Sequence, residues 1–221
     1  MNETPWENAD AENALSKDRS ERARTLGKWL WVLFWLFVPA AIAGFMKNDS
    51  LKPDAPGVYI TGIILNAVCS AAYGFILFKL AGEDDEYRIA GIFELIGVAA
   101  SIVMLFLPPA DEDATLTLVV TVPAAVISIL GEYHEYNAHA NILISASHDL
   151  SDKWRTLWKW LLGMQLAVIG SVLVTLILPP LGIATLFVTA IGTLAVYVMK
   201  LIYLYRTAKI FRNYPGDGIL A

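Results

Sequence analysis

Six long apolar blocks constrain this 221-residue chain more than any other feature of its sequence. A membrane-spanning helix needs about 20 mostly apolar residues. The blocks cover residues 28–46, 57–80, 89–107, 115–131, 155–178 and 181–200. None alternates apolar with polar residues as the strands of a membrane β-barrel do, and the backbone of a segment in lipid must be hydrogen-bonded internally. The blocks therefore predict an all-α integral membrane protein with six transmembrane helices.

The composition supports a membrane protein and excludes several other classes. Hydrophobic residues make up 57% of the chain and charged residues 17%, whereas a soluble domain has roughly 45–50% and about 25%. The mean hydropathy is +0.55. A lone cysteine, Cys69, rules out an intrachain disulfide, and a net charge of −5 offers no basic surface to nucleic acid. We expect the lipid bilayer as the main partner, with a homo-oligomer or a second membrane protein left open.

The Lys and Arg residues predict how the chain is oriented, because cytoplasmic loops carry an excess of them. All of them except Lys47 and Lys52 fall on the side that holds both chain ends, so both termini are predicted to be cytoplasmic. The short outer loops and the absence of a cleavable targeting segment are typical of a bacterial inner-membrane protein. Five tryptophans mark the starts of the first and fifth blocks, where aromatic rings favour the membrane interface: Trp29, Trp31, Trp154, Trp158 and Trp160.

The chain is predicted to be one membrane domain with two polar ends. A capping box at residues 4–7, with Pro5 at the first helical position, predicts a cytoplasmic helix or tail over residues 1–27. Residues 28–205 form the transmembrane domain. Turn-forming residues after Phe211 predict that the last helix ends there, within a cytoplasmic tail of residues 206–221.

Two of the helix starts nearly repeat each other. Residues 24–31 (RTLGKWLW) match residues 155–162 (RTLWKWLL) at six of eight positions, and a looser match begins at Arg88. Each precedes a helix, an outer turn and a returning helix, which predicts three parallel hairpin repeats. The alternative is that cytoplasmic helix starts share Arg, Lys and Trp for reasons of orientation alone. The helix count and hairpin spacing resemble those of small six-helix bacterial membrane proteins linked to acid resistance, with no shared motif.

Glu94 is the one acid placed well inside an apolar block, where a carboxylate is costly unless it is paired or faces a cavity. The repeat puts leucines at the equivalent positions, Leu30 and Leu161. One hypothesis is a proton- or cation-binding acid. The alternative is an acid near a helix end that reaches interfacial water or pairs with Lys79 or Lys200.

A second candidate site follows the fourth block. Helical spacing puts Glu132, Glu135 and His139 on one face, and carboxylate and imidazole groups on one face can bind a divalent metal ion. The alternative is that the helix continues past the membrane and shows water a polar face. No other cofactor is predicted, and the sequence contains no recognisable nucleophile–base pair or phosphate-binding loop.

Three functional hypotheses follow from these features. The first is a small multi-pass protein without a catalytic site that serves in stress response, assembly or regulation; it is favoured by the scarcity of buried charge. The second is a small transporter, or a cation or proton channel, that uses Glu94. The third is a metal-binding membrane enzyme that uses Glu132, Glu135 and His139, although an enzyme is the less expected outcome.

Overall fold

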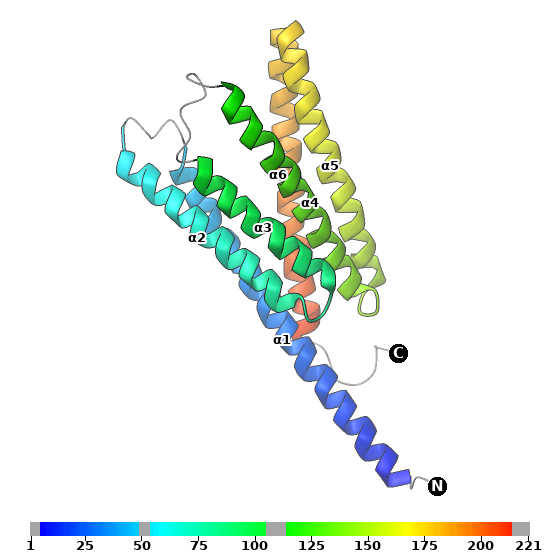
Figure 1. The fold of residues 1–221 in the computed structure, drawn as a ribbon. Coiled ribbons are helices and arrows are strands. Elements are labelled where there is room, and N and C mark those ends of the chain that lie inside the picture. The colour runs from blue at the N-terminus through cyan, green and yellow to red at the C-terminus, as the bar shows by residue number, and fades with distance from the viewer. Residues whose placement is uncertain (1–4, 49–53, 105–113, 214–221) are drawn as a thin grey trace.

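The computed structural model describes residues 5–48, 54–104 and 114–213 (Figure 1). Within these ranges every regular element is an α-helix and there is no strand. The helices are α1 (Pro5–Met46), α2 (Pro56–Leu80), α3 (Asp85–Met104), α4 (Ala114–Leu143), α5 (His148–Ile177) and α6 (Pro179–Arg212). The prediction that each apolar block is helical is therefore confirmed wherever the structure describes it.

Four of these helices are long and apolar enough to cross a membrane. The qualifying segments are Lys17–Met46, Pro56–Leu80, His148–Thr175 and Pro179–Arg212. Helices of this length and hydropathy are typical of a membrane protein. The described parts of α3 and α4 do not qualify; α3 carries several charged residues, and α4 becomes polar in its last third. Six complete spans therefore stay a prediction.

The six helices form a closed ring in chain order. Each helix packs mainly against its neighbours in the sequence, and α6 packs against α1 to close the ring. Three antiparallel hairpins, α1–α2, α3–α4 and α5–α6, thus lie next to one another (Figure 1). The predicted hairpin organisation is compatible with this arrangement, whereas a true sequence repeat stays a prediction.

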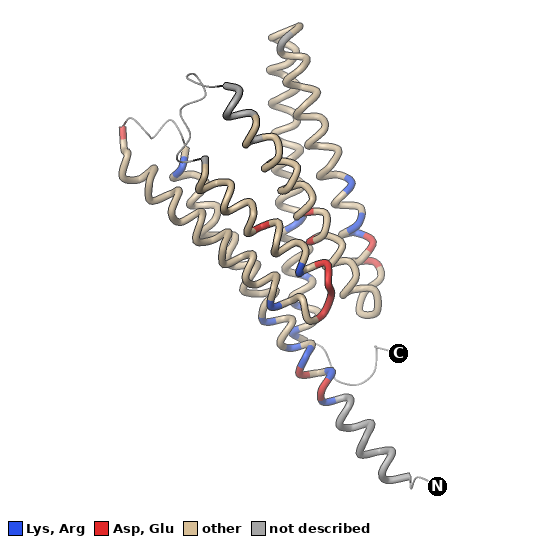
Figure 2. Tube along the Cα trace, in the orientation of Figure 1, with Lys and Arg blue, Asp and Glu red and all other residues tan. Residues whose placement is uncertain are grey.

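Most charged residues lie at one end of the ring (Figure 2). We call this the charged end; it contains the α2–α3 connection, residues 81–84, and the α4–α5 connection, residues 144–147. The last turn of α6 lies at the same end, and α1 continues past the other helices there (Figure 1). We call the other end the opposite end. That the charged end faces the cytoplasm stays a prediction.

The helices at the charged end are longer than the apolar blocks. α4 continues to Leu143 and α5 already begins at His148, so only four residues connect them. This lengthening places Glu135 and His139 inside α4 rather than in a loop. The polar cluster therefore has a rigid helical backbone.

The first and last helices extend beyond the apolar blocks toward the chain ends, and residues 206–212 of the predicted C-terminal tail are part of α6. α1 runs unbroken from Pro5 to Met46, so the predicted N-terminal helix and the first apolar block form one helix. Thr4 of the capping box lies outside the described residues. α6 ends at Arg212, one residue beyond the predicted Phe211, and Asn213 follows as its C-cap.

Asp84 fixes the α2–α3 connection to α4. Its Oδ1 accepts a 2.8 Å hydrogen bond from the backbone N–H of Glu86, as an N-cap residue does. Its Oδ2 accepts a 3.1 Å hydrogen bond from the Asn141 side chain. Glu86 also contacts His134 of α4. The start of α3 is thereby held against the end of α4.

The buried core lies at the charged end. Its largest fully buried side chains come from all six helices: Leu30, Leu33, Leu77, Leu80, Tyr87, Tyr136, His139, Leu143, Trp154, Leu161, Leu204 and Thr207. Trp154, which the sequence predicts at the membrane interface, is completely buried between helices. Its indole N–H donates a 3.1 Å hydrogen bond to the Thr207 hydroxyl. This bond offsets the cost of removing the indole N–H from water.

Gly27 allows the ring to close between α1 and α6. A Cβ atom at this position would lie 2.7 Å from the backbone nitrogen of Arg212. Real Cβ atoms do not approach backbone this closely, so only glycine fits at this contact. In the sequence match described above, Gly27 stands where the fifth helix has Trp158. The departure from the match therefore coincides with the contact that closes the ring.

Candidate functional site

A buried ion pair between α4 and α6 is the centre of the candidate site. The Lys200 Nζ lies 3.0 Å from each of the two Glu135 carboxylate oxygens. Both side chains are buried. Burying two charges costs several kcal/mol per ion unless the geometry is good and further hydrogen bonds complete the site, so the neighbouring groups decide whether this pair is favourable.

Tyrosines from two helices complete the surroundings of the pair. The Tyr73 hydroxyl of α2 donates a 2.5 Å hydrogen bond to Glu135 Oε1. The Lys200 ammonium lies 5.1 Å from the ring centre of Tyr136 and 5.8 Å from that of Tyr73. Cation–π contacts of this length are stabilising when the ammonium is desolvated. Three helices that are far apart in the sequence thus meet at this pair.

His139 extends the network toward the charged end. Its Nε2 lies 3.5 Å from Glu135 Oε1, and its Nδ1 shares a 2.8 Å hydrogen bond with the Tyr87 hydroxyl of α3. The imidazole also stacks on Trp154 of α5, with ring centres 4.5 Å apart. The network therefore joins residues of α2, α3, α4, α5 and α6, which belong to all three hairpins.

The charge state of the network follows from its environment. Glu135 and His139 lie beyond the predicted apolar block of α4. Burial alone would raise the pKa of Glu135, but Lys200, helped by His139 and Tyr73, lowers it to about 2. Burial lowers the pKa of His139, against an opposing effect of the Glu135 carboxylate. At neutral pH the network therefore contains a carboxylate and an uncharged imidazole.

A cavity of about 180 Å³ adjoins the ion pair inside the ring. Five of the six helices line it with these residues: Leu36, Phe37, Ala40, Cys69, Ser70, Tyr73, Glu94, Ser128, Glu132, Glu135, Tyr197 and Lys200. Three of them are acids and one is a lysine. Because Lys200 contacts both oxygens of Glu135, Glu94 and Glu132 are left without an ion pair among the described residues. The cavity is therefore acidic.

The structure brings the two sets of predicted site residues into one place. Glu94, Glu132, Glu135 and Lys200 all line the same cavity. The proposed partnership between Glu94 and Lys200 is replaced by the Glu135–Lys200 pair. Lys79 lies elsewhere, with its ammonium 5.2 Å from the ring centre of Phe75.

The three residues of the metal-binding face predicted on α4 have different surroundings. Glu135 and His139 contact each other, but the carboxylate is occupied by Lys200. Across the described ranges, no three His, Cys, Asp or Glu side chains are grouped so that they could hold a metal ion. The divalent metal site at Glu132, Glu135 and His139 therefore stays a prediction.

The aromatic members of the site are not predicted by the sequence. Tyr73, Tyr87 and Trp154 lie on three different helices, and nothing in their local sequence indicates that they contact Glu135 or His139. One signal was present: Lys200 ends the sixth apolar block, and Glu135 comes one turn after the fourth. Residues at the same ends of parallel helices lie at similar depth, so an acid and a lysine there are candidates to pair.

The fold and the site define an all-helical membrane protein in which a ring of helices surrounds an acidic cavity. No protein-family model matches the chain, and no curated protein or solved structure does so either. The function is therefore inferred from the site itself.

Proposed function

We propose that this protein conducts protons across a membrane through the acidic cavity at the centre of its helix ring. The observation that carries the proposal is the position of Glu94 and Glu132, which line the cavity without an ion pair among the described residues. Acids inside a membrane helix bundle are rare and typically belong to ion or proton pathways.

The charges around the cavity favour a proton over a metal cation. The Lys200 ammonium already compensates one of the three carboxylates. A carboxylate in a low-dielectric environment is destabilised when ionised, and protonation relieves that cost without a large ligand. The hydroxyl groups of Ser70 and Ser128 also line the space. A volume of 180 Å³ holds several waters at about 30 Å³ each, which provides a hydrogen-bonded path between the acids.

Polar residues continue from the cavity toward the opposite end. A second cavity of about 230 Å³ is lined by Lys47, Tyr59, Asn66 and Ser101, among others. Asn66 lies one helical turn from Ser70 along α2. Protons are therefore expected to enter from the opposite end.

The charged end is closed by packing. Beyond the ion pair, Tyr136, His139 and Leu143 of α4 are fully buried, as are Leu204 and Thr207 of α6. Release at this end requires the Glu135–Lys200 pair to open, so the pair serves as the gate in our proposal.

This proposal favours the second of the three hypotheses over the first. The lack of a catalytic constellation and an expected scarcity of buried charge favour a role in stress response, assembly or regulation. The buried Glu135–Lys200 pair and the acidic cavity beside it contradict that expectation.

The proposal includes six spans in a bacterial inner membrane, with the charged end in the cytoplasm. The distribution of Lys and Arg supports this orientation. Topology reporters inserted after Glu112 and after His148 are expected on opposite sides of the membrane. Reporters on the same side would contradict the six-span model.

Proton flux into liposomes tests the function directly. Purified protein is reconstituted with an internal pH-sensitive dye, and a potassium diffusion potential drives proton entry. Wild-type protein is expected to acidify the lumen faster than protein-free liposomes, and the Glu94→Gln and Glu132→Gln variants are each expected to lose tenfold or more of this rate. Asp152→Asn, an exposed acid at the charged end, is the matched control and should conduct normally.

Three results would contradict the proposal. The first is wild-type flux no greater than that of protein-free liposomes. The second is a Glu94→Gln/Glu132→Gln double variant that conducts like the wild type. The third is sodium or potassium flux that the same variants abolish while proton flux is unchanged, which would replace the proton by a metal cation.

A further inference from the structure

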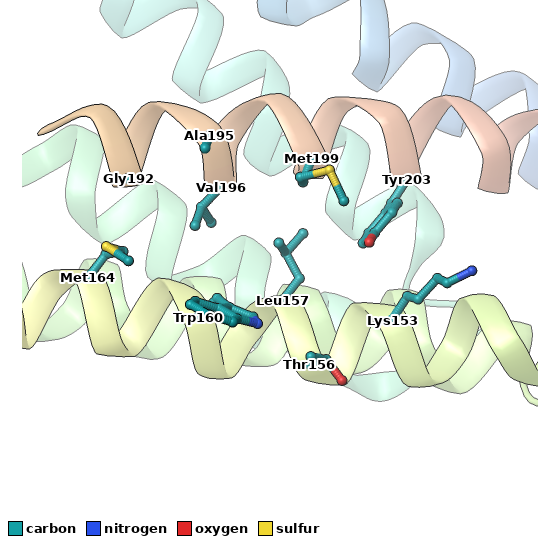
Figure 3. Close-up of a pocket in the computed structure, with 10 residues that line it drawn as sticks. All are labelled: Lys153, Thr156, Leu157, Trp160, Met164, Gly192, Ala195, Val196, Met199 and Tyr203. Carbon is teal, nitrogen blue, oxygen red and sulfur yellow. The ribbon is translucent and has the colours of Figure 1, made fainter. Parts of the chain in front are cut away.

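A groove runs along the contact between α5 and α6 (Figure 3). The central cavity is lined by other residues of α6, Tyr197 and Lys200. The apolar part of the groove has a volume of about 380 Å³. In Figure 3, Leu157 and Trp160 of α5 lie across from Val196 and Tyr203 of α6. Lys153 lies at one end of this apolar part.

The apolar part has the length of one membrane leaflet. Its lining residues on α6 extend from Gly192 to Tyr203, which is about 16 Å of helix at 1.5 Å per residue. Half of the hydrocarbon core of a bilayer is about 15 Å thick. Two methionines, Met164 and Met199, contribute flexible side chains that can adapt to a disordered chain.

A second, basic pocket continues the groove toward the charged end. Its volume is about 470 Å³, and Arg206 and Lys209 of α6 line it together with Asp149 of α5. The two pockets adjoin, because Lys153 in the apolar part donates a 2.5 Å hydrogen bond to Asp149 in the basic part. Apolar lining therefore passes directly into basic lining along one helix pair.

The basic pocket has an excess of positive charge. Asp149 is paired with Lys153. Arg206 and Lys209 are both exposed, and in the part of the chain that the structure describes neither forms an ion pair. Two uncompensated cations at the end of an apolar groove complement an anion that carries a long apolar chain.

We propose that this groove binds one anionic phospholipid of the leaflet at the charged end. An acyl chain lies against Val196, Met199 and Leu157, and the headgroup phosphate contacts Arg206 and Lys209. A zwitterionic phospholipid fits the apolar part equally well but offers no net negative charge to the two cations. Basic pockets between membrane helices are known to select anionic headgroups in this way. The inference does not depend on the proposed proton pathway.

The first experiment measures lipid retention by native mass spectrometry. Purified protein is incubated with equimolar phosphatidylglycerol and phosphatidylcholine of identical chains, and the lipid that remains bound is counted. Wild-type protein is expected to retain phosphatidylglycerol preferentially. Each basic residue near the surface contributes about 1 kcal/mol to anionic-lipid binding, so Arg206→Gln/Lys209→Gln is expected to weaken phosphatidylglycerol binding by about 10- to 30-fold.

Two variants separate the groove from general surface charge. Arg155→Gln/Lys159→Gln removes the same charge from exposed positions at the same end of α5, outside the groove, and should keep the preference. Ala195→Trp enlarges a residue that lines the apolar part and should weaken binding of both lipids. A size-exclusion elution profile and a helical circular dichroism spectrum like those of the wild type confirm that each variant is folded.

Several outcomes would overturn the inference. One is equal retention of the two lipids by wild-type protein. A second is an equal loss of phosphatidylglycerol binding in both double variants, which would indicate bulk electrostatic attraction. A third is competition by soluble glycerol phosphate at low concentration, which would mean that the site recognises a free phosphate rather than a lipid.

Discussion

The two ends of the helix ring are held together in different ways. At the charged end, aromatic and polar side chains interlock across all three hairpins, and Glu135 contacts partners from α2 and α6. At the opposite end, large apolar side chains point outward; Phe45 is 80% exposed and Ile177 is 79% exposed. Lipid is as apolar as these side chains, so helices in a membrane gain little from burying them. Specific contacts at the charged end must therefore fix the arrangement of the hairpins.

Two glycines near the opposite end make very close contacts within a hairpin, among the residues that the structure describes. A Cβ atom at Gly62 of α2 would lie 2.6 Å from the backbone nitrogen of Lys47, and one at Gly182 of α6 would lie 2.3 Å from the Thr175 Cα atom of α5. Small residues are the usual means of close packing in membranes. Glycine contacts thus bring the two helices of a hairpin together at the opposite end, whereas the buried polar network joins the hairpins at the charged end.

The largest effect is expected from Lys200→Met, which leaves the Glu135 carboxylate buried without its partner. Removing one member of a buried ion pair costs roughly 3–5 kcal/mol, and thermal unfolding in nanodiscs measures the loss. Lys159→Met, an exposed lysine, is the control and should unfold within a degree or two of the wild type. The double variant Glu135→Leu/Lys200→Met should recover much of the stability, because no unpaired charge remains. Equal stability of Lys200→Met and the wild type would mean that the pair does not hold the hairpins together.

That pair also shows what sequence could and could not predict. The apolar blocks located the helices well: block 57–80 became Pro56–Leu80, and block 181–200 lies within Pro179–Arg212. The sequence marks Glu94 as an exceptional acid, Glu135 as a candidate metal ligand and Lys200 as a possible partner of Glu94. The pairing of Lys200 with Glu135 is not predicted, because it depends on how far each helix is rotated and at what depth it lies, which hydropathy does not encode.

Trp154 illustrates the same limit. A tryptophan at the start of an apolar block is typical of the membrane interface, yet here the extension of α5 to His148 places it within the packed end of the ring. Its hydrogen bond to Thr207 and its stacking on His139 come from two other helices. Periodicity within one helix does not reveal such partners.

Two glycines on α1 allow a second comparison, because replacing each by alanine is expected to change the stability in a different direction. Gly27→Ala introduces a Cβ atom against the Arg212 backbone and is expected to cost about 1–3 kcal/mol. Gly44 lies toward the opposite end with no atom within 4 Å of an added Cβ, so Gly44→Ala should be neutral or stabilise by up to about 1 kcal/mol. Melting temperatures of the two variants and the wild type, measured in the same nanodiscs, test this prediction. If both variants shifted in the same direction, the close α1–α6 contact would not be the cause.

Removal of one hydroxyl group is expected to have a smaller effect. Tyr87→Phe deletes the hydrogen bond to His139 Nδ1 and leaves a buried polar atom unpaired, which costs about 1–2 kcal/mol. Tyr133, which is 40% exposed, offers the control Tyr133→Phe with a change below about 0.5 kcal/mol. Chemical denaturation of the detergent-solubilised protein compares the two. Equal losses would show that the buried network contributes no more than the protein surface.

The smallest effect concerns pH. Burial lowers the pKa of His139, whereas the unfolded chain takes up a proton there near pH 6.5. Acidification below that value therefore favours the unfolded state, by at most about 1.4 kcal/mol per pH unit for one proton. Melting temperatures between pH 7.5 and 5.5 are expected to fall less in His139→Gln than in the wild type. His148→Gln is the control: it removes an exposed histidine beside Asp152 and should decline as the wild type does, because this side chain lies outside the buried network. A decline that His139→Gln leaves unchanged would place the acid sensitivity outside the buried network.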